Sequence, residues 1–88
     1  MGRRSSPTVT YRVEFGGGAR IQFHSLPEDA RDALIERAVD RPWDAVVRPP
    51  GNDARFREAV FGAGRGLLGF YIDERALLIR IFDIVWIG

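Results

Sequence analysis

The residues of this chain best suited to chemistry are arginines, because the usual catalytic and metal-binding side chains are scarce. All thirteen basic residues are arginine, cysteine is absent, and His24 is the single histidine. Without lysine there is no lysine base or Schiff base, and without cysteine there is no disulfide or thiolate metal site. One histidine argues against a zinc site built from protein ligands. We therefore expect no metal and no cofactor, and any chemistry should depend on guanidinium groups that hold an anion.

The stretch "FGAGRGLLGFYIDE", residues 61–74, places Arg65 among glycines just ahead of an apolar run. Arg65 is either a phosphate-binding residue at the mouth of an active site or a solvated residue in a hairpin turn. The spacing of Gly64, Gly66 and Gly69 also matches G-x-G-x-x-G. No helix is predicted after it, so the dinucleotide-binding interpretation fails.

Charge is distributed unevenly along the sequence. Residues 24–45 hold six acids and three arginines, a net charge of −3, and residues 1–12 hold three arginines and no acid. Residues 48–70 hold four arginines and two acids, a net charge of +2. An anionic partner should therefore meet the second half of the chain or its N-terminal arm.

Several further side chains are candidates for a functional site, and each has a structural alternative. Arg80 interrupts an apolar strand and must face water, a carboxylate or an anion, since an unpaired buried charge is too costly. Tyr71 could be a core tyrosine, Trp86 a core or partner-facing residue, and His24 a proton carrier or a surface group. The remaining candidates are arginines that could hold phosphate or pair with acids: Arg48, Arg55 and Arg57.

The elements that would position these residues follow from periodicity. Alternating apolar residues predict a strand over 8–15, and short turns separate three later strands over 55–61, 67–72 and 76–87. Ser25 and Glu28 form a capping-box pattern for a helix that Pro42 ends, and one apolar stripe of this helix is formed by Leu26, Ala30, Ala33, Leu34 and Ala38. Residues 19–26 fit either a strand returning from the triple glycine or a short helix, and local pattern slightly favours the hairpin.

These elements predict one small α+β domain over residues 8–88, with helices on one sheet face and a long, near-central last strand. Residues 1–7 are expected to form a disordered arm. The sequence contains no run of about 18 apolar residues and no signal-peptide pattern, so we expect a cytoplasmic protein without a membrane partner.

The segments resemble the RelE/ParE toxin superfamily of type II toxin–antitoxin systems. The matching phrases are "YRVEF", "LPEDARDALIERAVDRPWD", "FREAVFGAGRGLLGFYIDE" and "ALLIRIFDIVWIG", which cover residues 9–88. The resemblance implies a β-α-α-β-β-β order, an antiparallel sheet with helices packed on one face, and a small antitoxin protein as partner. It also implies a helix within residues 17–25, against the local hairpin pattern. The sequence stops at Gly88, which implies a divergent member with a shortened C-terminus.

RelE-like members are ribosome-dependent mRNA endonucleases, whereas ParE-like members poison DNA gyrase. Cleavage by 2′-OH attack needs a proton acceptor, a proton donor and cations that hold the phosphate. The resemblance places the arginine of the central strand on Gly66, beside Arg65, and one inserted residue near Gly69 would bring Arg65 into its place. It also places basic residues of the neighbouring strands on Arg57, on Ala59 and, late in the last strand, on Trp86.

The resulting hypothesis assigns catalysis to Arg65, Arg57, Arg80 and Tyr71, and RNA or phosphate binding to Arg55 and Arg48. The alternative is a catalytically inactive RelE-fold binding module, either a gyrase inhibitor or a protein-interaction domain that pairs with an antitoxin-like partner or forms a homodimer. This alternative predicts an exposed apolar surface around Trp86, Ile87 and the adjacent edge strand.

Overall fold

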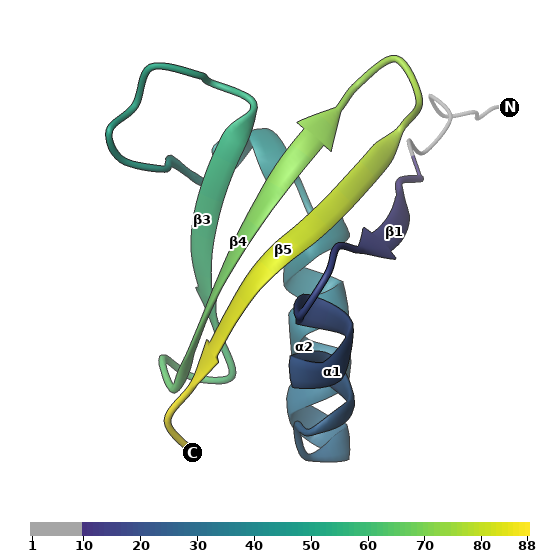
Figure 1. Cartoon of the computed structure of the whole chain (residues 1–88), viewed down its shortest axis with the longest axis vertical. Coiled ribbons are helices and arrows are strands. Elements are labelled where there is room, and N and C mark those ends of the chain that lie inside the picture. Colours follow the sequence, from purple (N-terminus) through teal and green to yellow (C-terminus); the bar gives the residue numbers. More distant parts are fainter. Residues whose placement is uncertain (1–9) are drawn as a thin grey trace, which may run out of the picture.

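The computed structural model describes residues 10–88, so the predicted arm and the first residues of the first predicted strand lie outside the described part. The bounds of the elements, in chain order, are β1 Arg12–Phe15, α1 Ala19–His24, α2 Glu28–Val39, a 3₁₀ turn Pro42–Asp44, β2 Val46–Val47, β3 Phe56–Phe61, β4 Gly66–Asp73 and β5 Leu78–Trp86 (Figure 1). The predicted order of one strand, two helices and three strands is confirmed. The short strand β2 is an addition that the sequence did not predict.

The five strands form one sheet in the order β1-β5-β4-β3-β2. Neighbouring strands are antiparallel except at β1 and β5, which run parallel. The parallel pair arises because two helices carry the chain from β1 across the sheet before the meander of β3, β4 and β5 returns to it. β5 has hydrogen-bonded neighbours on both sides, as its nearly continuous apolar sequence predicted.

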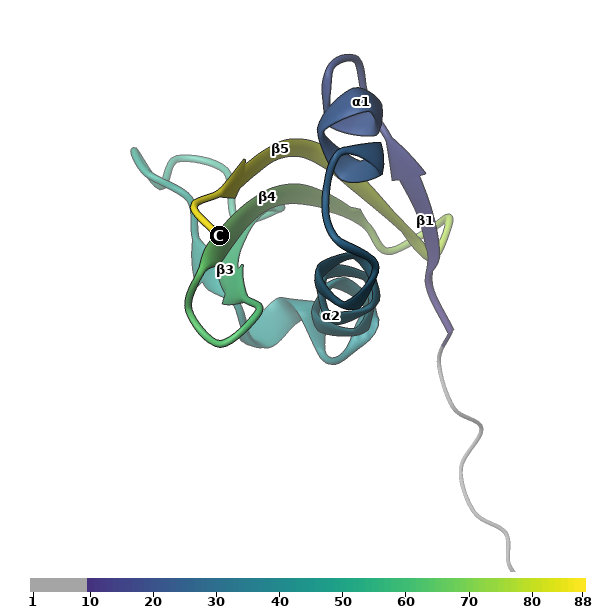
Figure 2. The same cartoon turned by 90° about the horizontal axis from the view of Figure 1, so that it is seen from below.

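Both helices pack on one face of the sheet, and α2 lies inside the curve of the strands in Figure 2. The predicted apolar stripe of α2 is confirmed, since Ala30, Leu34 and Ala38 are buried. They meet a layer of fully buried sheet residues: Leu68, Phe70, Ile72, Ile79 and Ile81. Each large side chain in this layer contributes roughly 1.5–3 kcal/mol of burial free energy, so this layer is the main source of stability.

The hairpin that local pattern favoured over residues 19–26 is wrong, and the helix that the resemblance implies is confirmed as α1. Ala19 is buried, and Phe23, one helical turn later, packs on Phe15 with ring centroids 4.5 Å apart. The capping box at Ser25 is also wrong, because Ser25 ends α1 and donates its hydroxyl to the Ile21 carbonyl. Packing of Ala19 and Phe23 at helical spacing therefore outweighed the alternating pattern that favoured a strand.

Neither helix packs on the opposite sheet face, which we call the open face. Cross-strand register places Glu58 of β3, Gly69 of β4 and Asp83 of β5 in one row on this face. Immediately beyond that row Phe70 pairs with Ile81, so β5 carries an extra residue, Phe82, as a β-bulge.

No helix within residues 10–88 has the length and apolar composition that crossing a membrane requires.

Candidate functional site

Arg65 lies in the turn between β3 and β4, just outside the sheet. Its Nε donates a weak hydrogen bond of 3.3 Å to the Gly62 carbonyl, and its guanidinium lies 5.3 Å from the ring centroid of Trp86. A bulge does occur beside Gly69, but the extra residue is in β5, and the β3–β4 register is regular from Phe56 to Phe61. Nothing therefore shifts Arg65 into β4, and Gly66 begins that strand.

Three of the four positions that the resemblance assigns to basic residues lie toward this same end of the sheet, and the fourth, Arg57, lies further along β3. Gly66 pairs with Phe61 on one side and Trp86 on the other, and Ala59 lies one row away on the same face. The Phe61 and Trp86 rings stack with centroids 5.7 Å apart and an interplanar angle of 21°. We call Phe61, Gly66, Trp86 and the covering Arg65 the aromatic end of the sheet.

Two glycines make room for these rings. A Cβ at Gly66 would overlap the Phe61 ring, and a Cβ at Gly62 would lie 2.8 Å from Cζ3 of Trp86. An arginine at position 66 would therefore collide with the buried Phe61. The position to which the resemblance assigns a phosphate-binding arginine is therefore flanked by an aromatic pair, and Arg65 is the one guanidinium among residues 10–88 that the structure places against that pair.

Apolar surface surrounds the aromatic end. A groove of about 310 Å³ runs between α1 and β5 and is lined by Ile21, Leu26, Ile84 and Trp86 together with two polar residues of α1. Ile21 is 73% exposed and Ile87 is 78% exposed. The alternative of an inactive binding module predicts an exposed apolar surface at Trp86 and Ile87, and the structure has exposed apolar side chains there. Exposed apolar side chains beside an apolar groove are typical of a protein-binding surface.

Arg57 points to the helix-covered side of the sheet, where it holds three backbone segments together. Its guanidinium donates to the carbonyls of Ala54, Trp43 and Ala45 at 2.6, 2.8 and 2.9 Å. The same group lies 5.0 Å from the ring centroid of Trp43. These bonds use three of the five N–H donors of the guanidinium, so the contacts of Arg57 favour a structural role.

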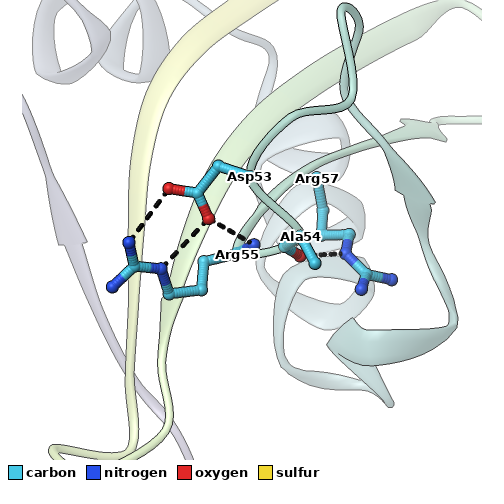
Figure 3. Close-up of polar contacts among 4 residues, drawn as sticks. All are labelled: Asp53, Ala54, Arg55 and Arg57. Carbon is cyan, nitrogen blue, oxygen red and sulfur yellow. Dashed lines mark hydrogen bonds and ion pairs between the residues drawn. The ribbon is translucent and has the colours of Figure 1, made fainter.

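The Arg55 side chain points away from Arg57 and pairs with Asp53 (Figure 3). Both side-chain bonds between them measure 3.0 Å, and the Arg55 amide adds a third at 3.0 Å. The hydrogen bonds from the Arg55 side chain hold the pKa of Asp53 below its usual value, and the carboxylate in turn raises the pKa of Arg55. The Arg55 guanidinium also lies 5.4 Å from the Tyr71 ring centroid, so it is satisfied locally.

Arg48 and Arg80 each have a carboxylate partner on the open face. Arg48 Nη2 lies 3.0 Å from Asp83, and Arg80 Nη2 lies 3.0 Å from Glu14 of the neighbouring strand β1. The expectation that Arg80 faces water, a carboxylate or an anion is confirmed. The open face thus contains Arg48, Arg80 and the Tyr71 ring, whereas Arg57 and Arg65 lie elsewhere. The six predicted site residues do not form one cluster.

His24 ends α1, where its ring contacts Phe23 edge-on at a centroid distance of 5.7 Å. The structure gives it no carboxylate partner among residues 10–88. The described residues also contain no group of three His, Asp or Glu side chains placed to hold a metal ion.

A carboxylate that sequence reasoning missed joins three parts of the fold. Glu74, in the β4–β5 turn, accepts hydrogen bonds from Trp43 Nε1 at 2.7 Å and from the Tyr11 hydroxyl at 2.8 Å. These two donors lower the pKa of Glu74, while burial, and then the neighbouring carboxylate, raise the pKa of Tyr11. No local sequence signal marks this network, because its members are 31 and 63 residues apart in sequence.

Solved structures with the same architecture are toxins and toxin complexes. No protein-family model and no curated protein sequence matches the chain. The chain is similar to the isolated E. coli RelE toxin, with a TM-score of 0.67 and 11% identity over 89% of this chain and 85% of that one. It is also similar to a mutant E. coli RelE bound to a peptide of the antitoxin RelB, with a TM-score of 0.67 and 12% identity over 85% and 81% of the two chains. The intact E. coli RelBE toxin–antitoxin complex matches with a TM-score of 0.61 and 12% identity over 89% and 98%. The chain therefore has the RelE fold.

Proposed function

We propose that this chain is the toxin-like component of a type II toxin–antitoxin pair and that it acts by binding a protein rather than by cutting RNA. Its fold is shared with RelE, and two of the similar structures hold RelE together with RelB or a RelB peptide. By analogy, the partner of this chain is a small antitoxin protein. This step is an inference from fold, and the choice between binding and cleavage depends on the site.

The observation that carries the choice is the aromatic end of the sheet. Negative charge develops on the phosphate in the transition state of RNA cleavage, and stabilising it requires cations held in place beside the phosphate. The structure instead stacks the half-buried Trp86 on the buried Phe61 over a glycine, and Trp86 lines the apolar groove beside α1. A surface of aromatic and aliphatic side chains with one arginine at its rim is typical of a protein interface.

The test is induced expression of the chain in E. coli, read by growth and by primer-extension mapping of mRNA 5′ ends. We expect growth to slow without new mRNA ends, and co-expression of a small neighbouring reading frame to restore it. Arg65→Ala should leave the growth defect in place, as should the matched change Arg75→Ala in the β4–β5 turn. Unchanged growth would refute the toxin assignment, and new mRNA ends that disappear in Arg65→Ala would refute the binding assignment.

A ribosome-dependent endonuclease is the second candidate, and one observation favours it. Arg65 forms no ion pair with any carboxylate of residues 10–88 and is exposed at the end of the sheet where the resemblance expects basic residues. Its guanidinium could turn from Trp86 toward a phosphate. The Arg65→Ala arm of the expression experiment separates this candidate from the first.

A further inference from the structure

A second hollow lies on the open face, away from the aromatic end of the sheet. It has a volume of about 390 Å³, and the loop from Arg48 to Asp53 forms its walls while Phe56 and Phe82 form its floor. We propose that this hollow is a binding site for an uncharged aromatic or aliphatic side chain of a protein partner. The proposal does not depend on the function proposed above, because the two sites share no residue.

Two aromatic rings, Phe56 and Phe82, line the hollow, and the Tyr71 ring packs against Phe56 beside it. Phe56 of β3 lies 5.0 Å from Tyr71 of β4 and 5.6 Å from Phe82 of β5, measured between ring centroids. Phe56 remains 37% exposed. Aromatic side chains have large contact areas and dominate protein interfaces. A partner side chain in the hollow would therefore pack against the exposed part of the Phe56 ring.

The hollow depends on local features that lower the stability of the fold. The bulge in β5 directs both Phe82 and Asp83 to the open face, and the absence of a side chain at Gly69 leaves space for the Arg48 guanidinium. Glycine inside a central strand weakens it. Arg48 Nη1 is buried without a hydrogen-bond partner among the described residues, and such a donor costs about 1–3 kcal/mol. Strained or imperfect features of this kind concentrate where a surface has a function.

The charges around the hollow indicate which ligand it would select. Arg48 is paired with Asp83, and Arg55 is paired with Asp53 at the rim, with 3.0 Å between the closest atoms of each pair. An incoming phosphate would have to compete with carboxylates that already hold these arginines. The floor between the two ion pairs is apolar. A neutral side chain fits this environment better than a nucleotide, which argues for a protein partner.

The walls are also ordered before a ligand arrives. The Arg48 amide donates to the Phe56 carbonyl at 2.8 Å, the Gly51 amide to the Arg48 carbonyl at 2.9 Å, and the Phe56 amide to the Asp53 carbonyl at 3.1 Å. The Arg48 guanidinium is fixed further by its position 5.1 Å from the Phe82 ring centroid. A preformed hollow needs little ordering on binding, so even a single side chain should have measurable affinity.

The experiment is chemical-shift mapping of the isotope-labelled chain with defined probes. We expect N-acetyl-tryptophanamide, and more weakly N-acetyl-leucinamide, to shift the backbone amides of residues 48–56 and 82–83. Adenosine 5′-monophosphate and inorganic phosphate should leave these amides unchanged. Shifts confined to the groove beside Trp86, stronger binding of the nucleotide in the hollow, or no shift with either neutral probe would overturn the proposal.

Matched variants test whether Phe56 forms the floor of the site. Phe56→Ala should weaken N-acetyl-tryptophanamide binding by roughly threefold to tenfold, from loss of one aromatic contact. Val60→Ala, on the same strand and the same face but outside the hollow, should bind like the parent chain. If Phe56→Ala unfolds, Phe56→Leu keeps the apolar volume, and it should bind the tryptophan probe more weakly but the leucine probe equally. Equal affinity of the parent, Phe56 and Val60 variants for the tryptophan probe would contradict the proposal.

Discussion

Trp86 stacks on Phe61 at the end of the sheet, with ring centroids 5.7 Å apart, beside Gly66, the position to which the resemblance assigns the family's central arginine. The pair therefore surrounds that position with apolar rings, of which Phe61 is buried. The pair also requires glycine at positions 62 and 66, because a Cβ at Gly62 would overlap the Trp86 ring and a Cβ at Gly66 would overlap the Phe61 ring.

Gly66→Ala should therefore destabilise the chain. The added Cβ overlaps the buried Phe61 ring, and overpacking of this kind costs about 1–3 kcal/mol of unfolding free energy. Urea denaturation measures the effect. Gly18→Ala is the control, since its φ of −69° is compatible with alanine and a Cβ there contacts nothing within 4 Å. Equal stabilities for the two variants would show that the aromatic end tolerates a side chain at position 66.

Arg57 should be needed for stability even when its charge is kept. Arg57→Lys retains a cation but cannot reach three carbonyls from a planar group, so we expect a loss of about 1–3 kcal/mol. Arg75→Lys, in the exposed β4–β5 turn, should be neutral. Thermal denaturation of both variants decides the role, because a residue kept only to bind phosphate would lose function without loss of melting temperature.

Acid should weaken the network around Glu74. The hydrogen bonds from Trp43 and then Tyr11 place the pKa of Glu74 below its unfolded-state value. The folded state therefore binds fewer protons, so the stabilisation is complete above the unfolded-state pKa and is lost as pH falls through the lowered value. Glu74→Gln keeps an acceptor but does not titrate. The gap in melting temperature between the parent and Glu74→Gln should narrow as pH drops from neutral to acidic, and a constant gap would contradict this account.

Gly69 and Arg48 should be energetically coupled. A Cβ at position 69 would overlap the guanidinium that pairs with Asp83. Gly69→Ala should be more destabilising in the parent chain than in an Arg48→Ala background, with a coupling of about 0.5–3 kcal/mol. A double-mutant cycle by chemical denaturation measures this coupling. Additive effects would mean that Arg48 moves aside freely, which would leave the hollow on the open face without its fixed wall.

The sequence predicted the parts of this fold that depend on strong periodicity. The stripe of α2 and the three later strands follow directly from apolar spacing, and they are confirmed. The segment 19–26 had two compatible periodicities, and only packing of Phe23 on Phe15 distinguishes them. Local pattern could not weigh that contact, because it forms between two elements.

The candidate site was harder to predict because it depends on register and direction. The resemblance required one inserted residue near Gly69 to bring Arg65 into the site, whereas the extra residue that the structure shows there belongs to β5 and leaves Arg65 in the turn. Arg55 and Arg57 are two residues apart, so the alternation of a strand predicts the same face for both. In the structure Arg57 instead bonds to backbone carbonyls and Arg55 bonds to Asp53 (Figure 3). Partner choice of this kind is set by the loops around a strand.

The central claim is that the aromatic end of the sheet binds protein and does not cleave RNA. The most direct measurement incubates the purified chain with ribosomes programmed with a defined, end-labelled mRNA and follows the length of that mRNA. We predict that the mRNA stays intact with excess chain, as it does with Arg65→Ala. Cleavage of the ribosome-bound mRNA by the parent chain, and not by Arg65→Ala, would contradict the claim.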